Sequence, residues 1–344
     1  MQEPDMPEFK KRPVGANWGD YGADDQLGRV NLLNEKQVLK GVAEVRAGRT
    51  FCLSLPLDLP GSNALNPRRF PPRLAPTCLG DDRYINFALA NNDPRLCDVV
   101  SDDEVRLSLQ YSSQWDSLAH VGALFDADDD GEAEMRYYNA HRADTDVCSH
   151  TADDAWHGSY ARRLGIDNFA AHGMQGRGVL IDLVRVFGRE RCVIGYDELM
   201  QAIEAQKVTI EAGDMLVLRT GFAEAIVAMQ GEPDIDVLRN TGAVLDGHDT
   251  RLCQWITDSQ IATLAADNYA VENLDDPLGP HVHAKMPLHH HCLFKLGLPL
   301  AELWYLQALA DWLHANDRSR FLLTAPPLRL PGAIGSPVTP IATV

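Results

Sequence analysis

Short, continuous apolar runs alternate with amphipathic segments along this chain. Residues 178–184 (GVLIDLV) form one such run, and residues 213–221 (GDMLVLRTG) contain another that follows a Gly-Asp turn. Runs of this length and character predict strands that are buried on both faces. Residues 34–47 and 197–206 have helical spacing, and Asn34 is the expected N-cap of the first. Because no shift of composition divides the chain, the alternation predicts one α/β domain.

Other segments carry weaker patterns. Strands are expected at 50–59, 105–111 and 320–330, a strand or strand end at 267–273, and helices at 257–266, 287–298 and 300–313. Residues 60–103 are rich in proline and predict a long excursion across the surface. Residues 1–30, rich in Gly, Asp and Pro, are interpreted as an N-terminal arm. We therefore expect an arm over residues 1–30 and a single domain over residues 31–344.

Charge and cysteine usage narrow the class of protein. The chain has 31 basic and 49 acidic residues, a net charge of −18, which argues against binding to nucleic acid or to an anionic membrane surface. Its seven cysteines are scattered and include no C-x-x-C pair, which favours reduced thiols in the cytoplasm. We expect no secretory signal, since the first residues lack an apolar stretch, and no membrane span.

The segment from Gln114 to His120 (QWDSLAH) is the sharpest local motif. Asp116 and His120 lie four residues apart, so they share one face if the segment is a helical turn, and they also converge in a tight loop. A carboxylate oxygen with an imidazole nitrogen suits Zn²⁺ or Mn²⁺. The alternative is a structural pair, with Asp116 as an N-cap and His120 hydrogen-bonded near the end of a strand.

A second polar cluster lies near the C-terminal end of the chain. Five histidines precede Glu302, at His281, His283, His289, His290 and His291. Successive residues of a helix point about 100° apart, so one or two of them at most can bind one metal ion. The alternative is a polar helix start behind Pro287.

Three further residues are weaker candidates for proton transfer. His150 flanks an acidic loop and His172 precedes an apolar strand, positions that are more typical of surface histidines. Glu272 lies between apolar residues at a strand end, so its carboxylate could be buried and paired. A phosphate-binding glycine loop and a Gly-x-Ser-x-Gly elbow are both missing, so the sequence does not support a serine hydrolase.

Taken in order, nine fragments resemble the cyclase family of metal-dependent hydrolases, which includes bacterial kynurenine formamidase and isatin hydrolase. The fragments are residues 18–33, 49–58, 114–122, 137–140, 176–183, 212–222, 265–273, 287–302 and 325–342. The resemblance implies a mixed central β-sheet or barrel-like core flanked by helices, of the swivelling β/β/α type.

The family signature His-x-Gly-Thr-His-x-Asp-x-Pro supplies metal ligands from its two histidines and its aspartate. Aligning His120 with the second histidine places Asp116 on the first and Gly122 on the aspartate. The chain therefore resembles a longer branch of the family that carries WD-x-L-x-H. The missing carboxylate at Gly122 favours a single metal ion.

The resemblance also implies roles for later residues. The C-terminal ligands of the family fall on His289 or His290 and on Glu302. A histidine that assists catalysis in the family falls here on Asp126, so this role is either vacant or filled by Glu272, His150 or His172. Trp115, Tyr138 and Asn139 are expected to shape the substrate pocket.

The activity implied is hydrolysis of a C–N or C–O acyl bond in a small molecule, such as a cyclic amide, a lactone or an N-acyl or formyl amide. One divalent ion per chain, Zn or Mn, would activate water for this reaction. The alternatives are a metal-stabilised binding protein without catalysis and a metal-dependent cyclase or dehydratase acting on a polyketide-like substrate. The resemblance further implies a homodimer or homotetramer.

Overall fold

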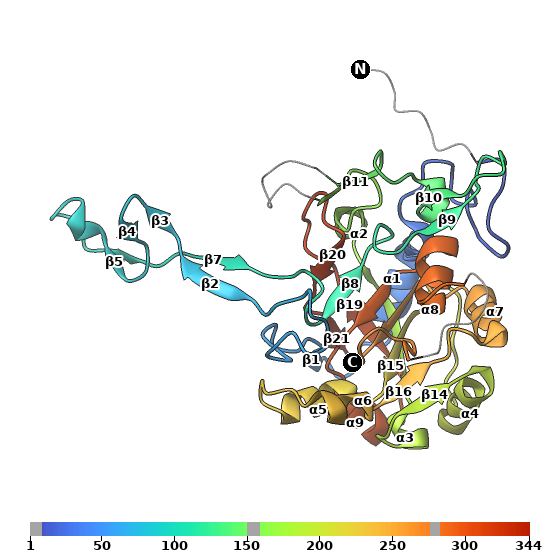
Figure 1. Cartoon of the computed structure of the whole chain (residues 1–344). Coiled ribbons are helices and arrows are strands. Elements are labelled where there is room, and N and C mark those ends of the chain that lie inside the picture. The colour runs from blue at the N-terminus through green and yellow to red at the C-terminus, as the bar shows by residue number, and fades with distance from the viewer. Residues whose placement is uncertain (1–8, 150–158, 276–282) are drawn as a thin grey trace.

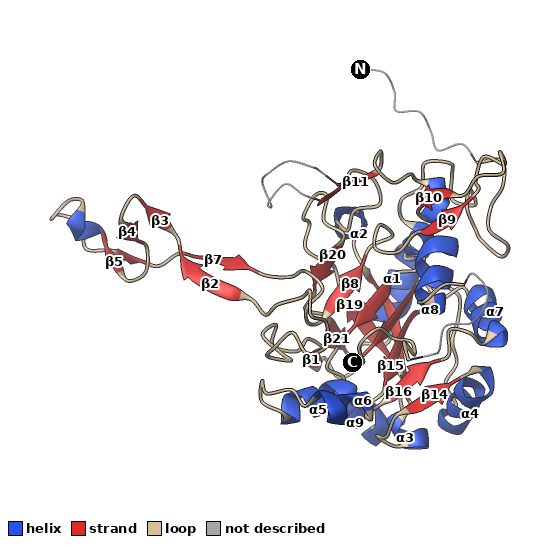
Figure 2. Cartoon of the chain, in the orientation of Figure 1, coloured by secondary structure: helices blue, strands red, loops and turns tan. Residues whose placement is uncertain are grey.

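A nine-stranded mixed sheet forms the centre of the molecule (Figure 2). The computed structural model describes residues 9–149, 159–275 and 283–344. In spatial order the strands are β1 (Thr50–Cys52), β21 (Ile341–Thr343), β19 (Arg320–Thr324), β13 (Gln175–Asp182), β15 (Met215–Arg219), β17 (Thr263–Ala266), β18 (Leu300–Glu302), β8 (Gln114–Asp116) and β20 (Gly335–Pro337). The run from β13 to β18 is parallel, and the strands on either side of it are antiparallel. The predicted α/β fold with a mixed central sheet is confirmed.

Helices surround the sheet, and smaller ribbons extend from it. The helices are α1 (Glu35–Val42), α2 (Asp167–His172), α3 (Val184–Phe187), α4 (Tyr196–Gln206), α5 (Phe222–Ala228), α6 (Ile235–Arg239), α7 (Thr250–Ser259), α8 (Pro287–His289) and α9 (Gln307–Ala315), with short 3-10 turns η1 (Gly28–Leu32), η2 (Leu89–Asn91) and η3 (Tyr138–Ala140) and the π-helical η4 (His290–Lys295). The two-stranded ribbons are β2 (Arg73–Pro76) with β7 (Asp103–Arg106), β3 (Cys78–Leu79) with β4 (Asp82–Arg83), β5 (Phe87–Ala88) with β6 (Val99–Val100), β9 (Ala123–Phe125) with β10 (Glu134–Arg136), β11 (Val147–Ser149) with β12 (Ser159–Ala161), and β14 (Cys192–Ile194) with β16 (Ala243–Leu245). None of the helices in the described part of the chain is both long enough and apolar enough to cross a bilayer.

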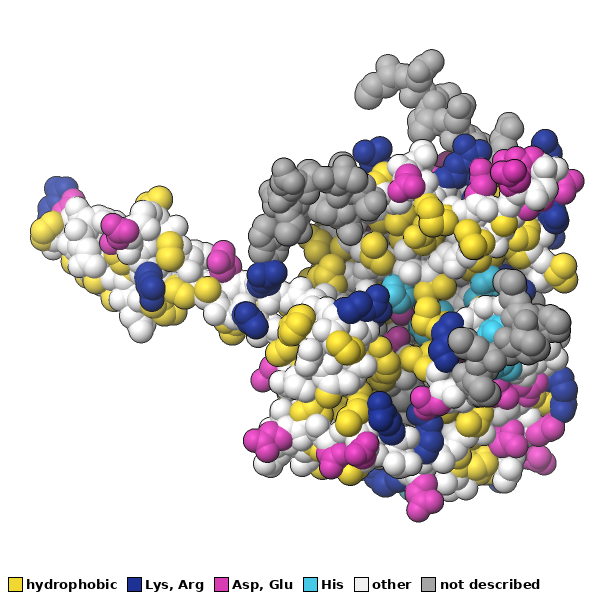
Figure 3. Space-filling model, viewed as in Figure 1, with side chains coloured by type: hydrophobic (Ala, Val, Ile, Leu, Met, Phe, Trp, Pro, Cys, Tyr) yellow, Lys and Arg dark blue, Asp and Glu magenta, His cyan; other side chains and the backbone are white. Residues whose placement is uncertain are grey.

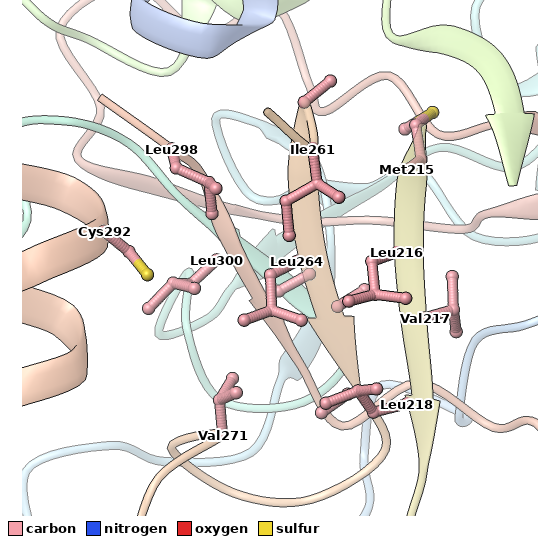
Figure 4. Packing of buried hydrophobic residues seen from close by; sticks show 14 of the residues in the cluster. Met215, Leu216, Val217, Leu218, Ile261, Leu264, Val271, Cys292, Leu298 and Leu300 are labelled. Carbon is pink, nitrogen blue, oxygen red and sulfur yellow. The ribbon is translucent and has the colours of Figure 1, made fainter. Parts of the chain in front are cut away.

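The parallel strands carry the core that the apolar runs predict. Leu216, Leu264 and Leu300 stand in register on β15, β17 and β18 and form a continuous row of buried side chains (Figure 4). Cys292 approaches this row from η4. Burial of each such leucine contributes roughly 1.5–3 kcal/mol to stability. Strands buried on both faces hold their register strongly, and this fixes the ends of β17 and β18.

Several expected elements are confirmed, and one of the caps is seen directly. Asn34 caps α1, since its side chain accepts hydrogen bonds from the backbone N–H groups of Lys36 and Gln37. The strands at 178–184 and 213–221 appear as β13 and β15, and the helix at 197–206 appears as α4.

Three expectations about secondary structure are wrong. Residues 257–266 contain the end of α7 and then β17, and residues 300–313 begin with β18 before α9. In both segments, pairing in the buried parallel sheet overrides helical spacing. The expected half-buried strand at 105–111 is the end of the exposed β7, and the buried strand is β8, a few residues later.

The prolines of residues 60–103 mark an arm rather than a path across the surface. The ribbon of β2 and β7 projects away from the body and carries the small ribbons β3–β4 and β5–β6 at its far end (Figure 1). The described part of the N-terminal segment, from residue 9 onward, contacts the body instead. There the Nε1 group of the buried Trp18 donates a hydrogen bond to the carbonyl of Phe294 at 2.7 Å.

Candidate metal centre

Three buried side chains from three separate elements converge at one point. Asp116 on β8, His289 on α8 and Glu302 on β18 each offer one ligand atom, and these atoms all lie within 4.8 Å of one another. In the antiparallel pair of β8 and β18, Gln114 stands opposite Glu302. Asp116, two residues further along, therefore lies on the same face as Glu302. Sheet register thus brings together two carboxylates that are far apart in sequence.

His289 lies between the two carboxylates. Its Nε2 atom is 3.6 Å from Glu302 Oε1 and 3.9 Å from Asp116 Oδ2. The three side chains have exposed fractions of at most 4%. A cation centred among these atoms would be bound by two carboxylate oxygens and one imidazole nitrogen, donors that suit a divalent metal ion.

Glu272 fixes the orientation of His289. The Nδ1 atom of His289 lies 2.6 Å from Glu272 Oε1. The carboxylate also accepts hydrogen bonds from the backbone N–H groups of Leu288 at 2.8 Å and His289 at 2.9 Å. With Nδ1 hydrogen-bonded to Glu272, the other ring nitrogen of His289, Nε2, faces Asp116 and Glu302. Such carboxylate–histidine pairs are the usual support of a metal-binding imidazole.

The charge of the cluster fits a divalent cation. Three carboxylates, from Asp116, Glu272 and Glu302, are buried around a single imidazole. Within the described ranges, no lysine or arginine forms an ion pair with any of the three. Asp116 Oδ2 also has no hydrogen-bond partner among these residues. Buried carboxylates without a counter-charge are costly, and a bound metal removes that cost.

The same electrostatics changes the pKa of two of these groups. Burial alone would lower the pKa of His289, but the adjacent carboxylates of Glu272 and Glu302 outweigh it and raise this pKa to about 10. For Glu302, burial raises the pKa, and the nearby His289 outweighs burial so that the pKa is lowered. Without a metal, a proton on His289 therefore supplies the positive charge that the cluster lacks.

His120 lies at the edge of the cluster and not inside it. Its Nε2 atom is 4.0 Å from Asp116 Oδ1, and its side chain is 21% exposed. The side-chain amide of Gln110 donates a hydrogen bond from Nε2 to Asp116 Oδ1, and this contact fixes the orientation of the amide. The same Nε2 atom lies 3.1 Å from His120 Nδ1. His120 Nδ1 is then the acceptor of a hydrogen bond, and the ring proton of the neutral imidazole is on Nε2.

At Gly122, which aligns with the aspartate of the family signature, there is no room for a side chain. A Cβ atom at Gly122 would lie 2.3 Å from the carbonyl oxygen of Arg136. No side chain fits there without movement of the backbone, so the position cannot supply a carboxylate. Asp126, another departure from the signature, lies 3.6 Å from Lys11 in an ion pair outside the cluster.

Two further candidates, His290 and His172, lie apart from this cluster. The ring of His290 packs against Phe294 at 4.9 Å between centroids, and burial lowers its pKa to about 4. His172 is exposed at the end of α2, with Nε2 3.1 Å from the carbonyl of Leu33. His150, the third residue considered for proton transfer besides His172 and Glu272, lies outside the described residues. Glu272 touches the centre and His172 does not.

The three residues expected to shape the pocket are buried, and two of them have their polar groups bound to the backbone. Trp115 donates from Nε1 to the carbonyl of Ala325 at 2.8 Å. Asn139 donates to the carbonyls of Gly22 and Ala23. The ring of Tyr138 is fully buried. Trp115 and Asn139 thus use their polar groups to bind the backbone.

Two side chains near the centre, Gln110 and Arg69, are not predicted as site residues by the sequence. Gln110 contacts both Asp116 and His120, and Arg69 donates from Nη1 to the carbonyl of Gln110 at 2.7 Å. Neither residue belongs to a recognisable motif, and only the folded chain brings them to the site. Figure 3 shows histidine, acidic and basic side chains gathered near the middle of this face of the body.

Comparisons with known proteins identify a family and a fold for this chain. The family model Cyclase, described as "Putative cyclase", matches residues 53–273. A crystal structure of a novel cyclase has 30% sequence identity and a TM-score of 0.75, with 98% of this chain and 100% of that chain covered. No curated protein matches the sequence.

Two isatin hydrolases share the fold at lower identity. Isatin hydrolase A from Labrenzia aggregata has 15% identity and a TM-score of 0.55, with 90% of this chain and 98% of that chain covered. Isatin hydrolase A from Ralstonia solanacearum has 16% identity and a TM-score of 0.51, with 86% of this chain and 91% of that chain covered. At these identities the likeness concerns the fold alone.

Proposed function

The chain belongs to the cyclase family, and from this membership and its buried Asp–His–Glu cluster we propose that it is a metal-dependent hydrolase of C–N or C–O acyl bonds in small molecules. The family membership confirms the resemblance noted in the sequence. The observation that carries the proposal is the convergence of Asp116, His289 and Glu302 within 4.8 Å in a buried, uncompensated acidic site.

The donor set supports one divalent ion per chain, Zn or Mn. Asp116, His289 and Glu302 would hold the ion and leave positions open for water and substrate. A divalent ion bound in this way polarises a carbonyl oxygen and lowers the pKa of water. Glu272 keeps the imidazole of His289 in the orientation needed for binding, so its role is to position and not to react.

His120 is the most exposed of these side chains, at 21%. Its Nε2 atom carries the ring proton, and Gln110 lies against its Nδ1 atom. From this position the Nε2–H group would donate a hydrogen bond to the nitrogen or oxygen that departs as its bond to the carbonyl carbon breaks, while the attacking water supplies the proton that this atom takes up.

The test combines metal analysis with a substrate screen. The purified chain is stripped with a chelator, reloaded with Zn²⁺ or Mn²⁺, and assayed on an aryl formamide, a cyclic imide and a lactone. We expect turnover of at least one class that is lost with the metal and in His289→Ala. The matched control is His290→Ala, which changes the neighbouring imidazole outside the cluster.

The outcomes separate this proposal from its alternatives. Stoichiometric metal with no acyl hydrolysis in any class contradicts the hydrolase and favours a binding protein. Turnover of a polyketide-like substrate by loss of water, with no acyl hydrolysis, favours a cyclase or dehydratase.

A further inference from the structure

Arg69 places an uncommitted positive charge beside the metal centre. It lies between β1 and β2, where the chain leaves the body for the arm. Its Nη1 atom donates to the carbonyl of Gln110, whose side chain contacts Asp116 and His120. Gln110 thus connects the guanidinium of Arg69 to the cluster.

Hydrogen bonds hold the segment of Arg69 beside the centre. The hydroxyl of Tyr269 accepts a hydrogen bond from Asn66 at 3.1 Å, and Asn66 belongs to the same segment as Arg69. Tyr269 precedes Ala270, whose backbone N–H donates to Glu302 Oε2 at 2.9 Å. The segment therefore contacts the surroundings of the centre at two points, through Asn66 and through Arg69.

Arg69 differs from Arg177 and Arg219, two buried arginines that are paired with carboxylates. Arg177 is paired with Asp214 at 2.8 Å, and Arg219 is paired with Asp182 at 2.7 Å. Among the residues that the structure describes, no carboxylate lies within ion-pair distance of Arg69, and a single backbone carbonyl accepts from it. Four of its five N–H donors remain for a ligand.

We propose that Arg69 forms a subsite for a carboxylate of the substrate, so that the acyl compound hydrolysed is an anion. This inference rests on the proposed function. A guanidinium binds a carboxylate through two parallel hydrogen bonds, which fixes both position and orientation. In a chain with a net charge of −18, a local positive charge is needed to attract an anion. A cavity of about 220 Å³ lies beside Tyr269 and Glu272, and its walls include the apolar Leu65 and Phe222. Arg191, Arg239 and Asp275 also line it, so it is partly polar.

The test measures binding, so it does not depend on turnover. Calorimetry compares isophthalate with benzoate on the zinc-loaded chain. The two carboxylates of isophthalate cannot both reach one cation, so the second reports on the subsite. We expect isophthalate to bind about tenfold more tightly or better, and Arg69→Gln to abolish this preference at unchanged zinc content. Arg69→Lys should retain part of it.

Arg68→Gln is the matched control, because Arg68 is the exposed neighbour of Arg69. It should keep the preference for isophthalate. Equal affinity of the unmodified chain for the two ligands, or a preference that survives in Arg69→Gln, overturns the subsite. If the preference is present but no acyl substrate is hydrolysed, the subsite stands and the hydrolase proposal fails.

Discussion

At the scale of single residues, His289 and Glu272 have different roles: His289 is the proposed metal ligand, and Glu272 holds its ring in position. His289 faces Asp116 and Glu302, and Glu272 supports it from behind through Nδ1. We predict that His289→Ala abolishes stoichiometric metal binding. Glu272→Gln should weaken metal affinity about 10- to 100-fold, because an amide places a donor against either the imidazole or the Leu288 N–H group.

Metal titration followed by calorimetry checks both variants. His290→Ala should bind metal like the unmodified chain, since its ring packs on Phe294 outside the cluster. Unchanged affinity in Glu272→Gln would show that Glu272 does not position the ligand.

Gly122 yields a second prediction at this scale. Because a Cβ atom would meet the carbonyl of Arg136 at 2.3 Å, Gly122→Ala should destabilise the fold by roughly 1–3 kcal/mol. Gly122→Asp should be at least as unstable and should bind no second metal ion. Chemical denaturation and metal analysis measure the two effects. A stable Gly122→Asp variant with two ions per chain would contradict the steric account.

The sequence predicts residue types better than it predicts contacts. Asp116, His289 and Glu302 could all be named as candidate ligands from their motifs, and the structure brings these three together. The choice between His289 and His290 depends on the direction of a helical side chain relative to a distant strand. Gln110 and Arg69 belong to no motif, and their places follow from tertiary contacts alone.

At the scale of elements, Asp267 connects the ends of two parallel strands. It follows β17, and its carboxylate accepts hydrogen bonds from the N–H groups of Thr220 at 2.6 Å and Gly221 at 2.8 Å, just after β15. Burial outweighs these hydrogen bonds and raises the pKa of Asp267 to about 7. The folded state therefore holds a proton that the unfolded state releases near pH 4.

Because of Asp267, the free energy of unfolding should depend on pH in one direction. Between about pH 4 and pH 7 the folded state binds more protons at Asp267 than the unfolded state, so this contribution to stability falls as pH rises. Asp267→Asn, which does not titrate, should lose that slope. Denaturation of both proteins at several pH values between 4 and 8 measures it. Parallel stability profiles would contradict the account.

The elements themselves show where local patterns are sufficient. The N-cap at Asn34 and the helix that follows it depend on local sequence alone, and the structure confirms both. Leu300–Glu302 looks helical by spacing but pairs with β17, since burial in the parallel sheet outweighs local preference. This pairing matters for function because it carries Glu302 into the metal centre.

At the scale of the whole molecule, the centre is assembled from β8, α8 and β18, and each element contributes one side chain. The order of strands could not be derived from the sequence, because the antiparallel strand β8 joins the sheet beside β18, far along the chain. The arm formed by β2 and β7 approaches this centre at its base, where Arg69 precedes β2 and donates to the carbonyl of Gln110.

Anomalous diffraction from crystals grown with zinc, recorded on both sides of the absorption edge, tests the central claim most directly. The account predicts one strong peak per chain, within coordination distance of Asp116, His289 and Glu302, that disappears in His289→Ala. A fully soaked crystal without a peak at these residues, or with its ion bound elsewhere in the chain, would contradict it.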